Sequence, residues 1–138
     1  MSDDSIEIVV VGAHLSGMAL NHELTERGGA LSRAIATEPL YKLYRLAGGP
    51  PFRPGLLRVG DGGAAIETEV WTLPAAGFAS FVAKIPSPLC IGTLHLADGS
   101  RAKGFLVEPA GLDDAEDITR HGGWRAFMAA AAGSAEHA

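Results

Sequence analysis

Residues 6–17 read IEIVVVGAHLSG, an apolar segment that runs straight into a short polar loop. The segment from Ile6 to Val11 is rich in β-branched side chains and is interrupted only by Glu7. Such a continuous run is typical of a buried strand. Gly12 ends the run, so the sequence predicts a buried strand that leads directly into a loop bounded by Gly12 and Gly17.

This loop is the most suggestive segment for chemistry. Its two glycines allow several backbone N–H groups to converge, and such a nest attracts anions. His14 lies in the loop, and a histidine changes between proton donor and acceptor near neutral pH. The alternative is that His14 is an ordinary turn residue. Asn21 is expected to cap a short helix over 22–27 that Gly28 and Gly29 end, and the alternative places its amide in a pocket.

Most of the remaining chain has the pattern of short strands separated by turns. Asp98-Gly99 predicts a hairpin between the last two strands, since both residue types tolerate a positive φ. Helices are expected from Pro74 to Ile85 and over 124–132, and an acidic helical turn is expected over 112–119. The predicted strands after the first are 30–37, 41–46, 56–59, 65–73, 91–96 and 101–107.

The helices interrupt the strands irregularly, without a repeating βα unit. This pattern favours an α+β fold, with a curved or barrel-like mixed sheet of about six strands and short flanking helices, over a doubly wound sheet. A length of 138 residues suits one hydrophobic core. We therefore expect a single domain over 1–132 and a disordered tail over 133–138.

The composition excludes several classes of function. A net charge of −5 argues against a nucleic-acid partner, which needs a basic face, and an anionic ligand would require a local positive site. No apolar run approaches the ~20 residues that span a bilayer, and the acidic start over 1–5 does not fit a signal peptide. The single Cys90 excludes an intrachain disulfide. We expect a cytoplasmic protein with no membrane partner.

Neither a metal nor a cofactor is expected. The five histidines are dispersed, and none are paired at the i, i+4 spacing of a zinc site. The Gly-x-Ser-x-Gly elbow of serine hydrolases does not occur. Glu67 and Glu69 share one strand face with Trp71 and are expected in solvent, with a pocket as the alternative. Lys84, Lys103 and the eight arginines include candidate anion anchors, among which the sequence does not choose.

Several distinct motifs follow one another along nearly the whole chain. The first two are VVGAHLSGMALN at 10–21 and LTERG at 24–28. Further motifs occupy residues 41–44, 64–73, 85–93, 103–106, 115–119 and 122–125. These motifs resemble the C-terminal domain of allophanate hydrolase, and the resemblance extends from about Ile6 to Phe127. Ala19 stands where the family commonly has proline, a departure that affects loop rigidity more than chemistry.

The resemblance implies a fold of the γ-glutamyl cyclotransferase-like superfamily, a mixed β-barrel with helices around it. It also implies decarboxylation of N-carboxycarbamate, or of a similar small dicarboxylate-like anion, in the breakdown of urea and allophanate. His14 would be the general acid/base that protonates nitrogen as carbon dioxide leaves. The implied substrate-binding residues are Gly12, Ala13, Leu15, Ser16, Asn21, Glu69 and Lys103.

Two alternatives stay open. The chain could be a non-catalytic ligand-binding or assembly module for a separate amidase, because it contains no stretch with the lysine and two serines of an amidase. It could also be a cyclotransferase, although residues 82–86, where the superfamily has its general-base glutamate, contain no carboxylate. The start over 1–4 looks like a natural beginning, so a free-standing protein is expected. A homodimer is the default oligomer.

Overall fold

The computed structural model describes residues 4–137, and the side chains of residues 4–133. The strands are β1 (Ser5–Val10), β2 (Ala30–Ala36), β3 (Tyr41–Arg45), β4 (Pro54–Arg58), β5 (Glu67–Pro74), β6 (Leu89–His95), β7 (Arg101–Val107) and β8 (Glu116–Asp117). The helices are α1 (His22–Thr25), α2 (Ala75–Ala83) and α3 (Trp124–His137), and two 3-10 turns are η1 (Pro109–Leu112) and η2 (Thr119–His121). None of the helices within these residues has the length and hydropathy needed to cross a membrane.

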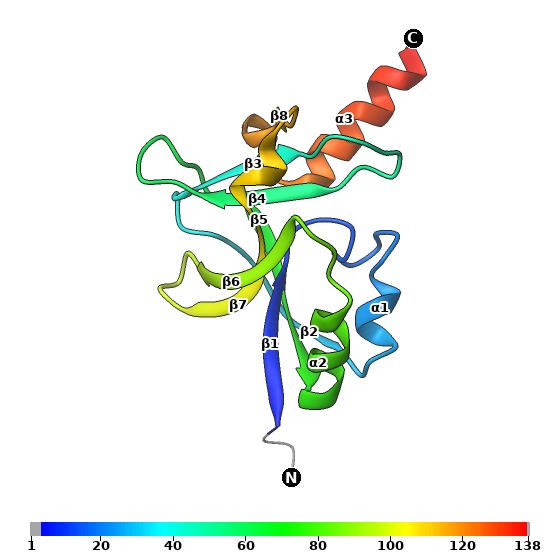
Figure 1. The fold of residues 1–138 in the computed structure, drawn as a ribbon, viewed down its shortest axis with the longest axis vertical. Coiled ribbons are helices and arrows are strands. Elements are labelled where there is room, and N and C mark those ends of the chain that lie inside the picture. Colours follow the sequence, from blue (N-terminus) through cyan, green and yellow to red (C-terminus); the bar gives the residue numbers. More distant parts are fainter. Residues whose placement is uncertain (1–3, 138) are drawn as a thin grey trace.

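The strands form two sheets. The larger sheet has the order β2-β5-β1-β7-β6, and the smaller has the order β4-β3-β8. Only the β1–β7 pair is parallel, so the larger sheet is mixed. In Figure 1, α1 and α2 lie on one side of β1 and the β6–β7 hairpin lies on the other, while α3 lies at the end of the molecule opposite the N-terminus.

The core is built around β1, the central strand of the larger sheet. Ile8, Val9 and Val10 are all fully buried. Helix α2 packs against β1 and β5, and β4 of the smaller sheet packs against β7. A strand with cover on both faces needs apolar side chains at every position, which is why this run does not alternate with polar residues.

The predicted α+β architecture with a curved mixed sheet is confirmed, with more strands than expected and without closure into a barrel. The acidic helical turn expected over 112–119 is wrong. Glu116 and Asp117 instead form β8, which pairs with β3, and the Asp117 carboxylate accepts the N–H of Thr119. The free edge of β3 therefore offers this segment better hydrogen bonds than an isolated turn would make.

The helix boundaries also differ from the prediction. Pro74 is the last residue of β5, and α2 begins after it at Ala75. The backbone of α3 continues to His137, beyond the expected end at Ala132. Ala138 lies outside the described residues, and the disordered tail over 133–138 stays a prediction. The Asp98-Gly99 hairpin is confirmed, with Gly99 at a φ of +86°.

A buried carboxylate joins the loop after β1 to the sheet and to α3. Glu69 on β5 is only 4% exposed, although it was expected in solvent. Its carboxylate accepts hydrogen bonds from the N–H of Ser16 at 2.7 Å and from the Ser16 hydroxyl at 2.6 Å. Trp71 Nε1 and Arg125 Nη2 each donate to the carboxylate at 3.0 Å. We call these four residues, Ser16, Glu69, Trp71 and Arg125, the loop anchor.

Burial alone would raise the pKa of the Glu69 carboxyl group. The donors from Ser16, Trp71 and Arg125 outweigh that effect, and the net pKa is lowered. A carboxyl group with a lower pKa in the folded than in the unfolded state stabilises the fold above its unfolded pKa of about 4.3. That stabilisation is lost as the pH falls through the lower, folded pKa.

We predict that Glu69→Gln lowers the free energy of unfolding by about 2–4 kcal/mol at pH 7, because charged hydrogen bonds and a buried ion pair are lost. The difference between the variant and the unaltered protein should shrink below about pH 4, where the native carboxyl group becomes protonated. Urea unfolding at several pH values measures both effects.

Glu67→Gln is the matched control. Glu67 is on the same strand but half exposed, and its carboxylate lies 3.6 Å from Arg125 Nη1. An exposed pair of this kind contributes less than about 1 kcal/mol. Equal destabilisation by the two variants would show that the anchor does not depend on the buried charge.

Candidate active site

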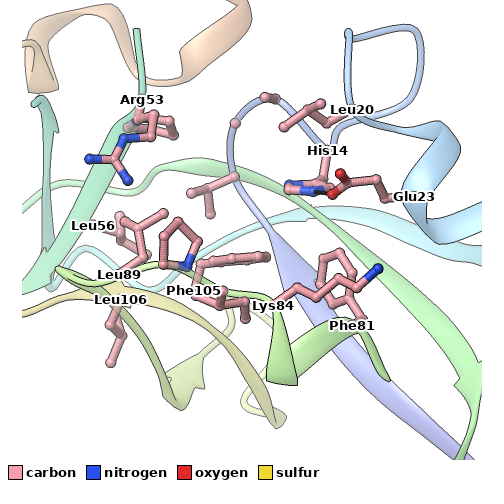
Figure 2. A pocket seen from close by; sticks show the side chains of 16 residues that line it. His14, Leu20, Glu23, Arg53, Leu56, Phe81, Lys84, Leu89, Phe105 and Leu106 are labelled. Atoms are coloured by element: carbon pink, nitrogen blue, oxygen red, sulfur yellow. Dashed lines mark hydrogen bonds and ion pairs between the residues drawn. The ribbon is translucent and has the colours of Figure 1, made fainter. Parts of the chain in front are cut away.

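A cavity of about 290 Å³ opens where β1 ends and the two sheets meet. The loop after β1, helix α1, the start of β4, helix α2 with the segment after it, and strands β6 and β7 all contribute to its wall (Figure 2). The lining residues are Val11, Gly12, Ala13, His14, Leu20, Glu23, Arg53, Pro54, Leu56, Phe81, Lys84, Ile85, Pro86, Leu89, Phe105 and Leu106. Only His14, Glu23, Arg53 and Lys84 carry titratable side chains, so most of the wall is apolar.

Two aromatic rings hold the imidazole of His14. The Phe105 ring stacks on it with the ring centroids 5.4 Å apart, and the Phe81 ring meets it edge-on at 5.0 Å. The side chain of His14 is 16% exposed. The ring is therefore fixed in an apolar setting, yet it remains on the cavity wall.

Glu23 lies beside this imidazole. Its Oε1 is 2.6 Å from Nε2 of His14, and its side chain is 39% exposed. Burial is the largest influence on His14 and lowers its pKa, while the hydrogen bond and the charge of Glu23 raise the pKa by a smaller amount. The net pKa lies below the ordinary value of 6.5, so His14 is mostly neutral at pH 7.

The carbonyl groups of the loop that carries His14 are engaged within the protein. The carbonyls of Gly12 and Ala13 accept the N–H groups of Leu15 and Leu20. The carbonyl of His14 accepts the Asn21 side-chain amide at 2.8 Å. Within residues 4–137, no backbone acceptor is bonded to the N–H of Gly12, Ala13 or His14. All three residues line the cavity, so their N–H groups are candidates for an anion nest.

The structure brings together only some of the predicted site residues. Gly12, Ala13 and His14 line the cavity. The N–H of Leu15 does not join the nest, because it donates to Gly12 and its side chain is fully buried. Asn21 occupies the expected N-cap position of α1, but its side chain makes no capping hydrogen bond. Its amide instead holds the loop through the His14 carbonyl.

The other predicted binding residues lie away from the cavity. Ser16 and Glu69 belong to the loop anchor and are fully engaged there. Lys103 lies on β7 and donates to the Thr93 hydroxyl at 2.9 Å, next to a shallow depression on another part of the surface. Their assignment to substrate binding therefore has no support in the geometry.

Several lining residues had no sequence signal. Glu23 and Phe81 lie on different helices, and Phe105 lies on a strand, so no spacing connects them to His14. Lys84 and Arg53 were among the candidate cations, and the structure selects them by placing both on the cavity wall. The residues that the structure describes contain no cluster of three His, Cys, Asp or Glu side chains that could hold a metal.

The chain is similar to several known proteins in sequence and in fold. The chain is 39% identical over 128 residues to the urea amidolyase of Saccharomyces cerevisiae, and covers 7% of the length of that protein. A solved Kluyveromyces lactis allophanate hydrolase superposes with a TM-score of 0.86 at 37% identity, over 90% of this chain and 21% of that one. A uropathogenic Escherichia coli protein, c4763, superposes with a TM-score of 0.84 at 33% identity, over 91% of this chain and 96% of that one.

More distant structures define the fold. A gamma-glutamyl cyclotransferase superposes with a TM-score of 0.52 at 11% identity, over 82% of this chain, which shows that the two have a similar fold, as expected. Residues 6–129 match the family described as the allophanate hydrolase C-terminal domain. Because this match spans most of its residues, the chain belongs to the family of allophanate hydrolase C-terminal domains.

Proposed function

We propose that this domain accelerates the decarboxylation of N-carboxycarbamate or of a similar small dicarboxylate-like anion. The observation that carries the proposal is a histidine held in an apolar cavity beside three available backbone N–H groups. The relatives named urea amidolyase and allophanate hydrolase suggest that an amidase, on the same chain or a separate one, supplies this substrate.

In the proposed reaction, the bond between nitrogen and one carboxylate carbon breaks and carbon dioxide leaves. The electron pair stays on nitrogen, which must then take a proton, and protonated His14 supplies it. Glu23 engages Nε2 of His14, and no group in the described part of the chain hydrogen-bonds Nδ1. We therefore assign the transferred proton to Nδ1.

The cavity favours this step for two reasons. The N–H groups of Gly12, Ala13 and His14 would hold the carboxylate that remains, and Lys84 adds a positive charge at the same end (Figure 2). The apolar walls disfavour a second carboxylate charge, whereas carbon dioxide is neutral and leaves without that cost. The positive groups at this site would attract an anion locally, although the net charge of −5 on the whole protein repels it.

One observation keeps the cyclotransferase alternative in view. Residues 82–86 contribute Lys84 to the cavity and no carboxylate, but Glu23 on α1 places a carboxylate there from another element. A base is thus present for an amine proton. Release of 5-oxoproline from a γ-glutamyl amine, with no acceleration of decarboxylation, would favour this second function.

His14→Gln should reduce the acceleration of decarboxylation by about 10²–10⁴-fold, because glutamine can hydrogen-bond but cannot transfer the proton. N-carboxycarbamate is generated in place from allophanate by a purified amidase, and carbon dioxide release is followed with and without this domain. His22→Gln is the control, since His22 is exposed and does not line the cavity. An unchanged rate in His14→Gln would contradict the proposed role.

The acceleration should also depend on pH in a defined direction. Because the proton donor is protonated His14, kcat/KM should fall as the pH rises through the pKa of the free protein's His14, which lies below 6.5. Glu23→Gln removes the influences that raise this pKa, so the fall should occur at lower pH. NMR titration of the imidazole, beside the rate profile, measures both shifts. If the pH profile of kcat/KM in Glu23→Gln matched that of the unaltered protein, Glu23 would not be the residue that sets the charge of His14.

Gly12 is required for the shape of the loop. A Cβ at this position would overlap Cγ of Pro54, which lines the same cavity from the start of β4. Gly12→Ala should therefore displace the loop and weaken the binding of malonate, a stable analogue with CH₂ in place of NH, by at least about tenfold, or about 1.4 kcal/mol. Gly60→Ala is the control, because nothing lies within 4 Å of its added Cβ. Equal affinities in the two variants would place malonate elsewhere.

A further inference from the structure

The cavity is larger than the proposed substrate requires. Its volume of about 290 Å³ corresponds to roughly ten water molecules, at the ~30 Å³ that each occupies in the liquid. N-carboxycarbamate consists of two carboxylates joined by a single nitrogen, and it would leave part of this space unfilled. The remaining space is part of the same cavity, so another part of the substrate could fill it. The chemistry of that part must match the residues that line the space.

The two ends of the cavity differ in character. Figure 2 shows His14, Glu23, Lys84 and Phe81 gathered at one end. At the other end lie the side chains of Leu56 and Leu89, contributed by β4 and β6, with Arg53 above them. The ring of Phe105 lies between the two groups, and it is the same ring that stacks on His14.

The leucine end suits an apolar group and not a second carboxylate. The side chains of Leu56 and Leu89 offer no hydrogen bond, and a carboxylate placed against them below Arg53 loses its hydration without replacement. Methylene groups placed there instead leave water at a gain in free energy. Pro86 and Ile85 are further apolar residues of the cavity wall.

We propose that the substrate of this domain is a small dicarboxylate-like head group that carries an aliphatic substituent. The head group lies against His14 and the loop after β1, and the substituent lies against Leu56 and Leu89. The assignment of the head group rests on the proposed function, whereas the assignment of the substituent rests on the size and the wall of the cavity.

Malonate and n-butylmalonate test the inference, because they share one head group and differ only in the substituent. Titration calorimetry with the whole chain should give a dissociation constant at least about tenfold lower for n-butylmalonate, since burial of each methylene is favourable. In the unaltered protein, NMR should show Overhauser contacts from the butyl protons to the methyl groups of Leu56 and Leu89.

Leu89→Gln should reduce the ratio of the two dissociation constants toward one, because it places an amide where the butyl group binds. Leu31→Gln is the matched control. Leu31 is 48% exposed on β2 and does not line the cavity, so this variant should keep the ratio of the unaltered protein.

The outcomes separate the two proposals. Malonate binding without any gain for n-butylmalonate, or Overhauser contacts at other residues, would overturn the inference and leave the proposed decarboxylation intact. Failure of both compounds to bind would overturn the head group and the substituent together. A preference for n-butylmalonate that survives Leu89→Gln but not Leu31→Gln would place the substituent outside the cavity and would also overturn the inference.

Discussion

The buried carboxylate of Glu69 is the constraint on which the site depends. Glu69 lies opposite Val10 in the β1–β5 pair, so its carboxylate is beside the point where the chain leaves the sheet. Ser16 returns to that carboxylate six residues later, which closes the segment between them into a fixed loop. A carboxylate removed from water requires strong donors; the loop supplies two, and the sheet and α3 supply one each. The position of His14 follows from this closure.

The closed loop has a defined polarity. Its carbonyl groups are used inside the protein by Leu15, Leu20 and the amide of Asn21. The N–H groups of Gly12, Ala13 and His14 have no backbone acceptor within the described residues, so they remain free as positive dipoles in a protein of negative net charge. The glycine surplus has one clear use here, because the close approach of Pro54 leaves no room for a side chain at position 12.

The elements that local patterns define were predictable. The β-branched run of β1, the Asp98-Gly99 hairpin and the end of α1 before Gly28 all follow from the preferences of neighbouring residues. The segment 112–119 was wrong because its conformation depends on the free edge of β3, to which no local signal refers. Glu69 was placed in solvent for a similar reason, since its partners Ser16 and Arg125 are 53 and 56 residues away.

The sequence by itself determined the family, the α+β class, the strand that carries the loop, and the position of His14 within that loop. These features depend on residue type and short-range spacing, so they can be predicted without a structure. Only the tertiary structure decided that Glu23, Phe81, Lys84 and Phe105 surround that histidine, and that Glu69 and Lys103 do not. The physical reason is that a cavity is assembled from side chains on separate elements, and packing between those elements is set by the fold as a whole.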